Sequence, residues 1–107
     1  MPHYGLFINA PLGAEVPTDE ELAAHDGFPE QVASMGGKEL TGWGMLPASE
    51  ARTIRAGHVT DGPFAEAKEV VAGFCIIEAR DLDHAVAIAR LNPATWRGSV
   101  EVRQLFI

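Results

Sequence analysis

The sequence predicts an α+β fold with an antiparallel sheet, because two β-α-β units follow one another and a hairpin is inserted between them. Two of the four main strand candidates, 4–9 and 73–79, are apolar on both faces, whereas 100–104 alternates apolar and polar residues. A strand that is apolar on both faces must be covered on both faces, which agrees with a central position in the sheet. These observations predict the ferredoxin-like split βαβ arrangement, in which the first and third strands are central.

The first β-α-β unit begins with the β-prone run 4–9. Thr18, with Glu21 three residues later, forms a capping box that opens a helix. Pro29 has no backbone N–H and predicts a kink in this helix. The steps of three and four residues predict an inner stripe made of Leu22, His25, Pro29, Val32 and Gly36. Residues 40–46 are the strand that completes the unit.

The insert between the units is predicted to be a hairpin. The segments 52–55 and 58–60 are its strands, and Ala56 and Gly57 form the turn. A short helix of good helix formers is then expected over 65–71.

The second unit starts with the strand 73–79. Asp81 caps the following helix, and Pro93 ends it. The apolar face of this helix consists of Leu82, Ala85, Val86, Ile88 and Ala89. Residues 100–106 form the last strand, which together with the second lies at an edge of the sheet.

The composition describes one globular domain over residues 1–107, with 47% hydrophobic and 21% charged residues. The net charge of −7, from 15 acidic and 8 basic side chains, opposes binding to a phosphate backbone. No apolar run approaches the roughly 18 residues that span a bilayer, and the first residues lack the layout of a signal peptide. The single cysteine, Cys75, cannot form an internal disulfide. We therefore expect a cytoplasmic protein that binds neither nucleic acid nor membrane.

The two helices of this topology can cover one face of the sheet. The central strands are apolar on the other face as well, so that face needs a partner. The simplest partner is a second copy of the same chain packed sheet to sheet, and we expect a homodimer.

The most specific motif is the run Thr-Asp-Gly-Pro-Phe-Ala-Glu-Ala-Lys-Glu over residues 60–69, followed by Gly73-Phe74 and an Ile-Ile-Glu strand end. In this motif the sequence resembles the YCII-related family, and more narrowly the branch named for its Asp-Gly-Pro-Phe motif. The resemblance extends to Asp81-Leu82-Asp83, Ala85 and the strand Val100-Glu101-Val102-Arg103. The resemblance covers nearly the whole chain. It implies a single domain of the dimeric α/β-barrel type. The family has no generally established activity.

The resemblance implies two kinds of function. A His–Asp pair in a cleft has been proposed as catalytic for some relatives, whereas others are encoded beside or fused to alternative sigma factors. Here His25 occupies a plausible place for the helix histidine. Many relatives carry Asp-Pro near the last helix, where this chain has Asn92-Pro93, and an Asn side chain cannot act as a carboxylate base.

His25 and Asp61 are the candidate catalytic residues. The imidazole of His25 has an ordinary pKa near 6.5, which suits proton transfer, and it lies on the predicted inner stripe. Its alternative role is to cap the backbone carbonyl that Pro29 leaves without a partner. Asp61 lies in a turn, where site residues are common. Its alternative role is an Asx turn, in which its carboxylate accepts hydrogen bonds from the N–H groups just downstream.

Trp43, Phe64 and Arg103 are the candidate substrate-binding residues. The two aromatic rings, with Trp96, could line an apolar pocket for a small molecule, although single aromatic residues are more often core or dimer contacts. Arg103 could bind a carboxylate of a ligand. Its alternative role is a cross-strand or intersubunit salt bridge, because Arg103 and Glu101 lie on the same face of the last strand and both charges need pairing if a partner subunit covers that face.

No metal and no cofactor are expected. The four histidines and Cys75 lack the spacing of metal ligands, and no glycine-rich phosphate loop is present. Two hypotheses remain open. The first is a small-molecule-binding or enzyme-like protein of the dimeric α+β barrel type, with cofactor-free acid–base chemistry in a cleft. The alternative is a non-catalytic regulatory or interaction module linked to sigma-factor-dependent transcription.

Overall fold

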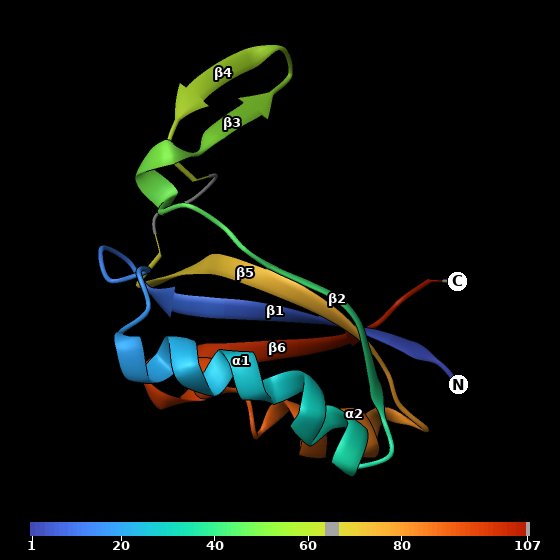
Figure 1. Cartoon of the computed structure of the whole chain (residues 1–107). Coiled ribbons are helices and arrows are strands. Elements are labelled where there is room, and N and C mark those ends of the chain that lie inside the picture. Colours follow the sequence, from blue (N-terminus) through green and yellow to red (C-terminus); the bar gives the residue numbers. More distant parts are fainter. Residues whose placement is uncertain (64–66, 107) are drawn as a thin grey trace.

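The computed structural model describes residues 1–63 and 67–106 and shows a four-stranded antiparallel sheet with two helices (Figure 1). The strand order is β2-β5-β1-β6, so the predicted α+β class and the central position of the first and third main strands are confirmed. The strands of this sheet are β1 (His3–Pro11), β2 (Lys38–Gly44), β5 (Glu69–Glu78) and β6 (Ser99–Gln104).

Helices α1 (Asp19–Ser34) and α2 (Leu82–Ala89) lie on the same face of the sheet (Figure 1). The connections also contain two short 3₁₀ helices, η1 (Ala48–Glu50) and η2 (Pro93–Trp96). No helix in the described ranges is long and apolar enough to cross a membrane.

The core lies between the helices and the sheet. Leu6 of β1 pairs with Cys75 of β5, and opposite partners in a sheet share a face, so both side chains point toward the helices. Leu6, Val32 of α1 and Ile88 of α2 are fully buried and belong to the same apolar cluster. Each such side chain contributes roughly 1.5–3 kcal/mol to folding. This packing fixes α1 against the helix side of the sheet.

Helix α1 begins at the predicted capping box. The Glu21 N–H donates to the Thr18 hydroxyl at 3.1 Å, and the Thr18 N–H donates to the Glu21 carboxylate at 2.9 Å. The predicted inner stripe is confirmed at Val32 but is wrong at Leu22 and Pro29, which are exposed. The buried positions are Glu21, Phe28 and Val32. The inner face of α1 therefore begins with a charged residue that a hydrophobic pattern does not select.

Helix α2 begins at the predicted cap, where the His84 N–H donates to the Asp81 carboxylate at 2.8 Å. The His84 ring is buried and bonded at both nitrogens. Its Nδ1 accepts from the Arg80 N–H at 3.0 Å, and its Nε2 is 2.7 Å from the Met35 carbonyl oxygen. This arrangement requires the Nε2-protonated tautomer and ties α2 to the end of α1.

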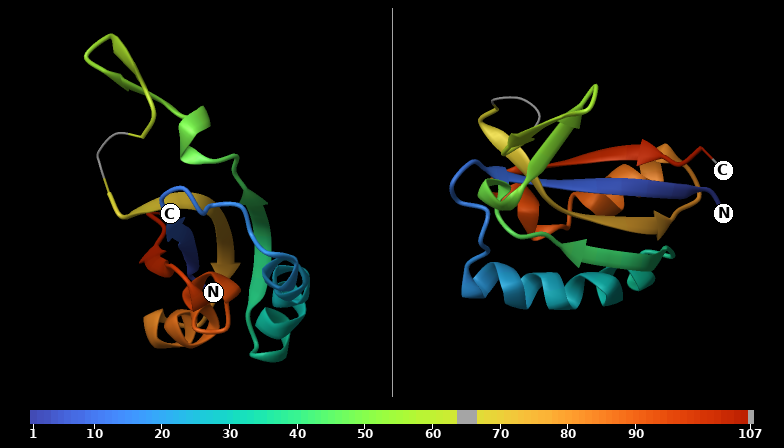
Figure 2. Two further views of the ribbon diagram at one scale, coloured as in Figure 1. Left: turned by 90° about the vertical axis from the view of Figure 1, so that its left-hand side faces the viewer. Right: turned by 90° about the horizontal axis from the view of Figure 1, so that it is seen from above.

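The predicted hairpin is confirmed as β3 (Arg52–Arg55) and β4 (His58–Asp61). Ala56 and Gly57 both have positive φ, at 49° and 82°, as the twist-matched two-residue turn requires. Figure 2 shows that the hairpin projects from one end of the main sheet, on the side opposite the helices.

The helix predicted over 65–71 is wrong in its described part. Residues 69–71 open β5, where Val71 pairs with Asn9 and Glu69 pairs with Pro11 of β1. The long partner strand therefore overrides the local helix propensity. The φ of Gly62, beyond the end of β4, is +90°, a conformation that favours glycine. Its N–H donates to the Ala51 carbonyl at 2.8 Å, which closes the base of the hairpin.

The face of the sheet away from the helices carries an exposed apolar row. Trp43, Phe74 and Phe7 pair in register across β2, β5 and β1. They are 68%, 36% and 38% exposed. We call this surface the open face. It is the face that the sequence predicts to be covered by a second copy.

Candidate functional site

A cavity of about 360 Å³ lies between α1 and the sheet, and we call it the helix-side cavity. Its volume is at the lower end of the range of small-molecule sites. Glycines of the sheet keep it open: Gly42 and Gly44 of β2 and Gly73 of β5 border it without side chains. A Cβ at Gly42 would come within 2.7 Å of a Glu39 carboxylate oxygen, and a Cβ at Gly73 within 2.8 Å of the Trp43 carbonyl oxygen. Helix α1 borders the cavity with Leu22, His25 and Phe28.

His25 borders the helix-side cavity and is half-buried. Within the described ranges its ring makes no hydrogen bond or ion pair, so it does not act as the carbonyl cap that was its alternative role. Burial lowers the pKa of His25, and the negative charges of Glu21 and Asp26 partly oppose that effect. The imidazole is therefore neutral at neutral pH and has the capacity to accept a proton.

Glu39 is a site residue that the sequence analysis missed. It pairs with Ile77, which places it on the helix side of the sheet, and it borders the same cavity as His25. Burial raises the pKa of its carboxyl group. Among the described residues the carboxyl has no hydrogen-bond or ion-pair partner. The register shifts between Glu39 and Thr41, so simple alternation along β2 gives no signal that Glu39 points inward.

Glu21 and Arg97 form the ion pair at the η2 end of the cavity. The Arg97 guanidinium donates to both Glu21 oxygens through Nε at 3.1 and 3.2 Å, and through Nη2 to one of them at 2.9 Å. The Arg97 guanidinium, and next the Thr18 N–H, lower the pKa of Glu21 to about 2. The same guanidinium donates to the Ala14 carbonyl at 3.3 Å. This pair holds the segment before β6 against α1, and each charge is matched by the other.

Cys75 also borders the cavity, beneath α1. Burial, and secondly the negative charge of Glu39, raise the pKa of its thiol to about 12. A thiol with this pKa stays protonated at neutral pH and is a poor nucleophile. We therefore assign Cys75 to the wall of the cavity.

Asp61 is not brought to His25 within the described chain. It ends β4 of the projecting hairpin and does not border the helix-side cavity (Figure 1). Its side chain is 90% exposed, and its carboxylate lies 3.2 Å from Arg52 Nε. The hairpin pairing of Arg52 with Asp61 explains this contact. The alternative Asx turn depends on N–H groups after Pro63, which lie outside the described residues. The structure thus places Glu39, and not Asp61, beside the cavity that His25 borders.

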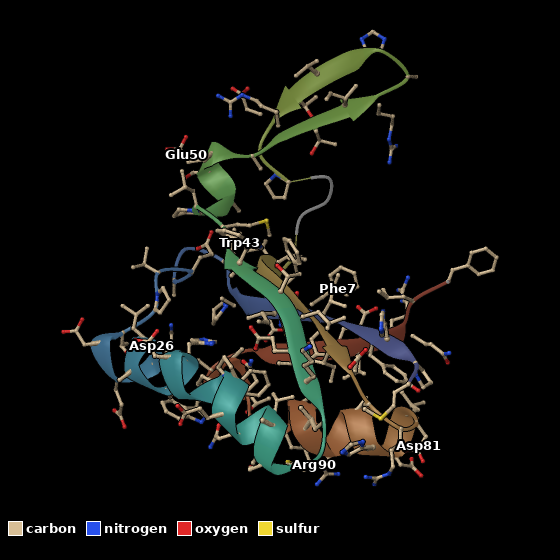
Figure 3. The ribbon with its side chains drawn as sticks, turned by 45° about the vertical axis from the view of Figure 1, so that its right-hand side comes forward. Phe7, Asp26, Trp43, Glu50, Asp81 and Arg90 are labelled. Carbon is tan, nitrogen blue, oxygen red and sulfur yellow. The ribbon has the colours of Figure 1, made fainter. Side chains whose placement is uncertain are left out.

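The three candidate substrate-binding residues have different positions. Trp43 lies at the η1 end of β2 (Figure 3), where its side chain belongs to the open face, and the residue also borders the cavity. Its indole N–H donates to the Thr41 hydroxyl at 2.9 Å. Phe64 lies outside the described residues. Arg103 lies on the open face, 2.7 Å from a Glu101 carboxylate oxygen, and does not border the cavity. This ion pair joins two residues of the same strand, so it is neither the cross-strand nor the intersubunit salt bridge that was the alternative role of Arg103.

Asn92 and Trp96 have structural positions. The Asn92 side chain is almost fully buried and accepts from the Ala94 N–H at 2.9 Å, which caps η2. Trp96 is 54% exposed at the end of η2. In residues 1–63 and 67–106, no group of three or more His, Cys, Asp or Glu side chains has the geometry of a metal site.

Residues 8–106 match the family model of the YCII-related domain. An uncharacterized protein of Rhizobium meliloti (strain 1021) is 46% identical to this chain over an alignment of 69 residues, and the match covers 57% of this chain. The match covers 54% of that protein, so the chain spans about half the length of this relative.

Proposed function

The chain belongs to the YCII-related family, and we propose that it binds a small molecule in the helix-side cavity and uses His25 for acid–base chemistry there. One observation carries the proposal. His25 and Glu39 come from different elements, border the same cavity and have no described protein partner. Groups held this way are available to a ligand, whereas structural polar groups in protein interiors are normally hydrogen-bonded.

The two groups have complementary roles in this proposal. The neutral His25 ring accepts a proton from the substrate and returns it at another position, which is the chemistry of an isomerase or a lyase. The Glu39 carboxyl binds the substrate and orients it toward the ring. Burial makes both charged forms costly, so a substrate that displaces water from the cavity strengthens the interactions with both groups.

Proton transfer can be tested without the natural substrate. We expect the protein in D₂O to catalyse hydrogen–deuterium exchange at the acidic C–H of at least one compound in a panel of small ketones and unsaturated lactones. His25→Asn should reduce that rate about 100-fold or more, because the proton acceptor is removed. Proton NMR of the compound measures the rate.

Asp61→Asn is the matched control, because it removes the other candidate residue and should leave the rate unchanged. Equal exchange by the wild type and His25→Asn would contradict the catalytic role. Binding in the cavity without exchange would favour the non-catalytic regulatory module.

We further propose that a second copy of the chain covers the open face. The exposed row of Trp43, Phe74 and Phe7 supports this proposal, because large apolar patches on a sheet face mark interaction surfaces. Light scattering at micromolar concentration should give about twice the 11.5 kDa mass of one chain. Phe74→Glu should give the mass of one chain, because it buries an unpaired charge in the dimer. A wild-type protein with the mass of a single chain would contradict the dimer.

A further inference from the structure

The charged groups around the helix-side cavity are mostly of one sign. Four carboxyl groups border it, and the described residues provide one permanent cation, Arg97. The Glu21–Arg97 pair is neutral as a unit, because the guanidinium donates to both carboxylate oxygens. The three other carboxyl groups, which have no such cation, belong to Glu15, Asp26 and Glu39.

These three carboxyl groups differ in their surroundings. Glu15 accepts from the Ala48 N–H at 2.8 Å, and chiefly this hydrogen bond lowers the pKa of its carboxyl, so it is ionised at neutral pH. Asp26 is exposed on α1, next to His25 (Figure 3). Glu39 lies inside the cavity and has no described partner. Ionised Glu39 therefore carries an uncompensated desolvation cost, which a bound cation would offset.

Negative charge near the cavity acts to raise the pKa values of two neutral groups in its wall, His25 and Cys75. The charges of Glu21 and Asp26 act to raise the pKa of His25 against the effect of burial. The charge of Glu39 adds to burial in raising the pKa of the Cys75 thiol. Both effects have the sign expected of a negative electrostatic potential, which attracts cations and repels anions.

Much of the remaining wall is apolar, although Asn9 and Asn92 also border the cavity. It includes Ile8, Leu22, Phe28 and Met45. Apolar walls with one oriented polar group are typical of sites for small organic molecules. A molecule that fits must therefore combine an apolar body with a group that the carboxylates favour.

We infer that the ligand of the helix-side cavity is a small organic cation, in which an ammonium group pairs with Glu39 and an apolar body lies against Leu22 and Phe28. The inference rests on the proposed function of the cavity and names its ligand class. Pairing of the ammonium with Glu39 leaves His25 as the proton acceptor. Anionic substrates are excluded from the cavity by Glu15, Asp26 and Glu39.

Three probes of nearly equal shape test the ligand class at pH 7: benzylamine, which is a cation, benzyl alcohol, which is neutral, and benzoate, which is an anion. NMR shifts of the His25 and Gly42 amides report the position of binding, and their titration gives Kd. We expect benzylamine to bind at least about tenfold more tightly than benzyl alcohol, and benzoate to bind most weakly. Added salt should reduce the advantage of benzylamine.

Glu39→Gln should abolish the advantage of benzylamine and leave the affinity for benzyl alcohol unchanged. Glu101→Gln is the matched control, because it removes one carboxylate from the open face and should leave both affinities unchanged. A thermal melt confirms that each variant is folded. If benzyl alcohol or benzoate binds in the cavity as tightly as benzylamine, the ligand is not an organic cation, but the cavity still binds small molecules. If no probe shifts the His25 or Gly42 amide, both the ligand class and the proposed binding site are wrong.

Discussion

Gly98→Ala is expected to destabilise the fold by about 3 kcal/mol, because a Cβ at this position overlaps the backbone of the central strand β1. It would collide with the Asn9 carbonyl oxygen and would lie 2.9 Å from the Asn9 carbonyl carbon and 3.1 Å from the Ala10 Cα. Backbone atoms of a paired central strand cannot move aside as a flexible side chain would. Urea unfolding followed by circular dichroism measures the loss.

Gly44→Ala is the matched control for this prediction. Gly44 is the last residue of β2, whereas Gly98 directly precedes β6, and nothing lies within 4 Å of the position that the Gly44 Cβ would take. We expect a change within about 0.5 kcal/mol for this variant. Similar unfolding free energies for the two variants would show that the approach of Gly98 to β1 is not as close as described.

Acid should selectively remove the stability contributed by the Glu21–Arg97 pair. The folded-state pKa of Glu21 is about 2, against an ordinary value of 4.5, so the ionised carboxylate is favoured in the folded state. This contribution is complete above the ordinary pKa and is lost as the pH falls toward the folded-state pKa. Because the Arg97 side chain is partly exposed, solvent screens the pair, and we expect a contribution of about 1–2 kcal/mol at neutral pH.

Unfolding of the wild type and Glu21→Gln at several pH values measures this contribution. The wild type should be the more stable protein at pH 7, and the difference between the two should shrink between pH 5 and pH 2. Glu20→Gln, which changes an exposed neighbour, should show no comparable trend. A difference between wild type and Glu21→Gln that is independent of pH would contradict the role of the pair.

Local signals in the sequence predicted much of the fold. The capping side chains of Thr18 and Asp81 each bond an N–H group three residues further along the chain. The hairpin turn consists of only two residues, Ala56 and Gly57. Each of these features could therefore be recognised without the tertiary structure. The apolar character of β1 and β5 on both faces predicted the strand order. The residues of α1 that face the sheet were predicted only in part, because Glu21 is buried through its pairing with Arg97, which is 76 residues away in the chain.

The candidate site was predicted in part. His25 faces the cavity because it lies between Glu21 and Phe28 on the inner side of α1. Glu39 was missed because the irregularity at the next residue changes the alternation along β2. Asp61 was selected for its specific motif, but pairing within the hairpin holds it beside Arg52.

The most direct test of the site is an NMR titration of His25 and Glu39 in the wild-type protein. Carbon-13 labelling of the Glu carboxyl groups and nitrogen-15 labelling of the His rings report the two groups separately. The account predicts a pKa of His25 below 6.5 and a pKa of Glu39 above 4.5, because both groups face a partly enclosed cavity without protein partners. Asp26→Asn should lower the pKa of His25 further, since its negative charge acts to raise it. Ordinary pKa values for both groups would show that they are solvated independently and would contradict a shared acid–base site.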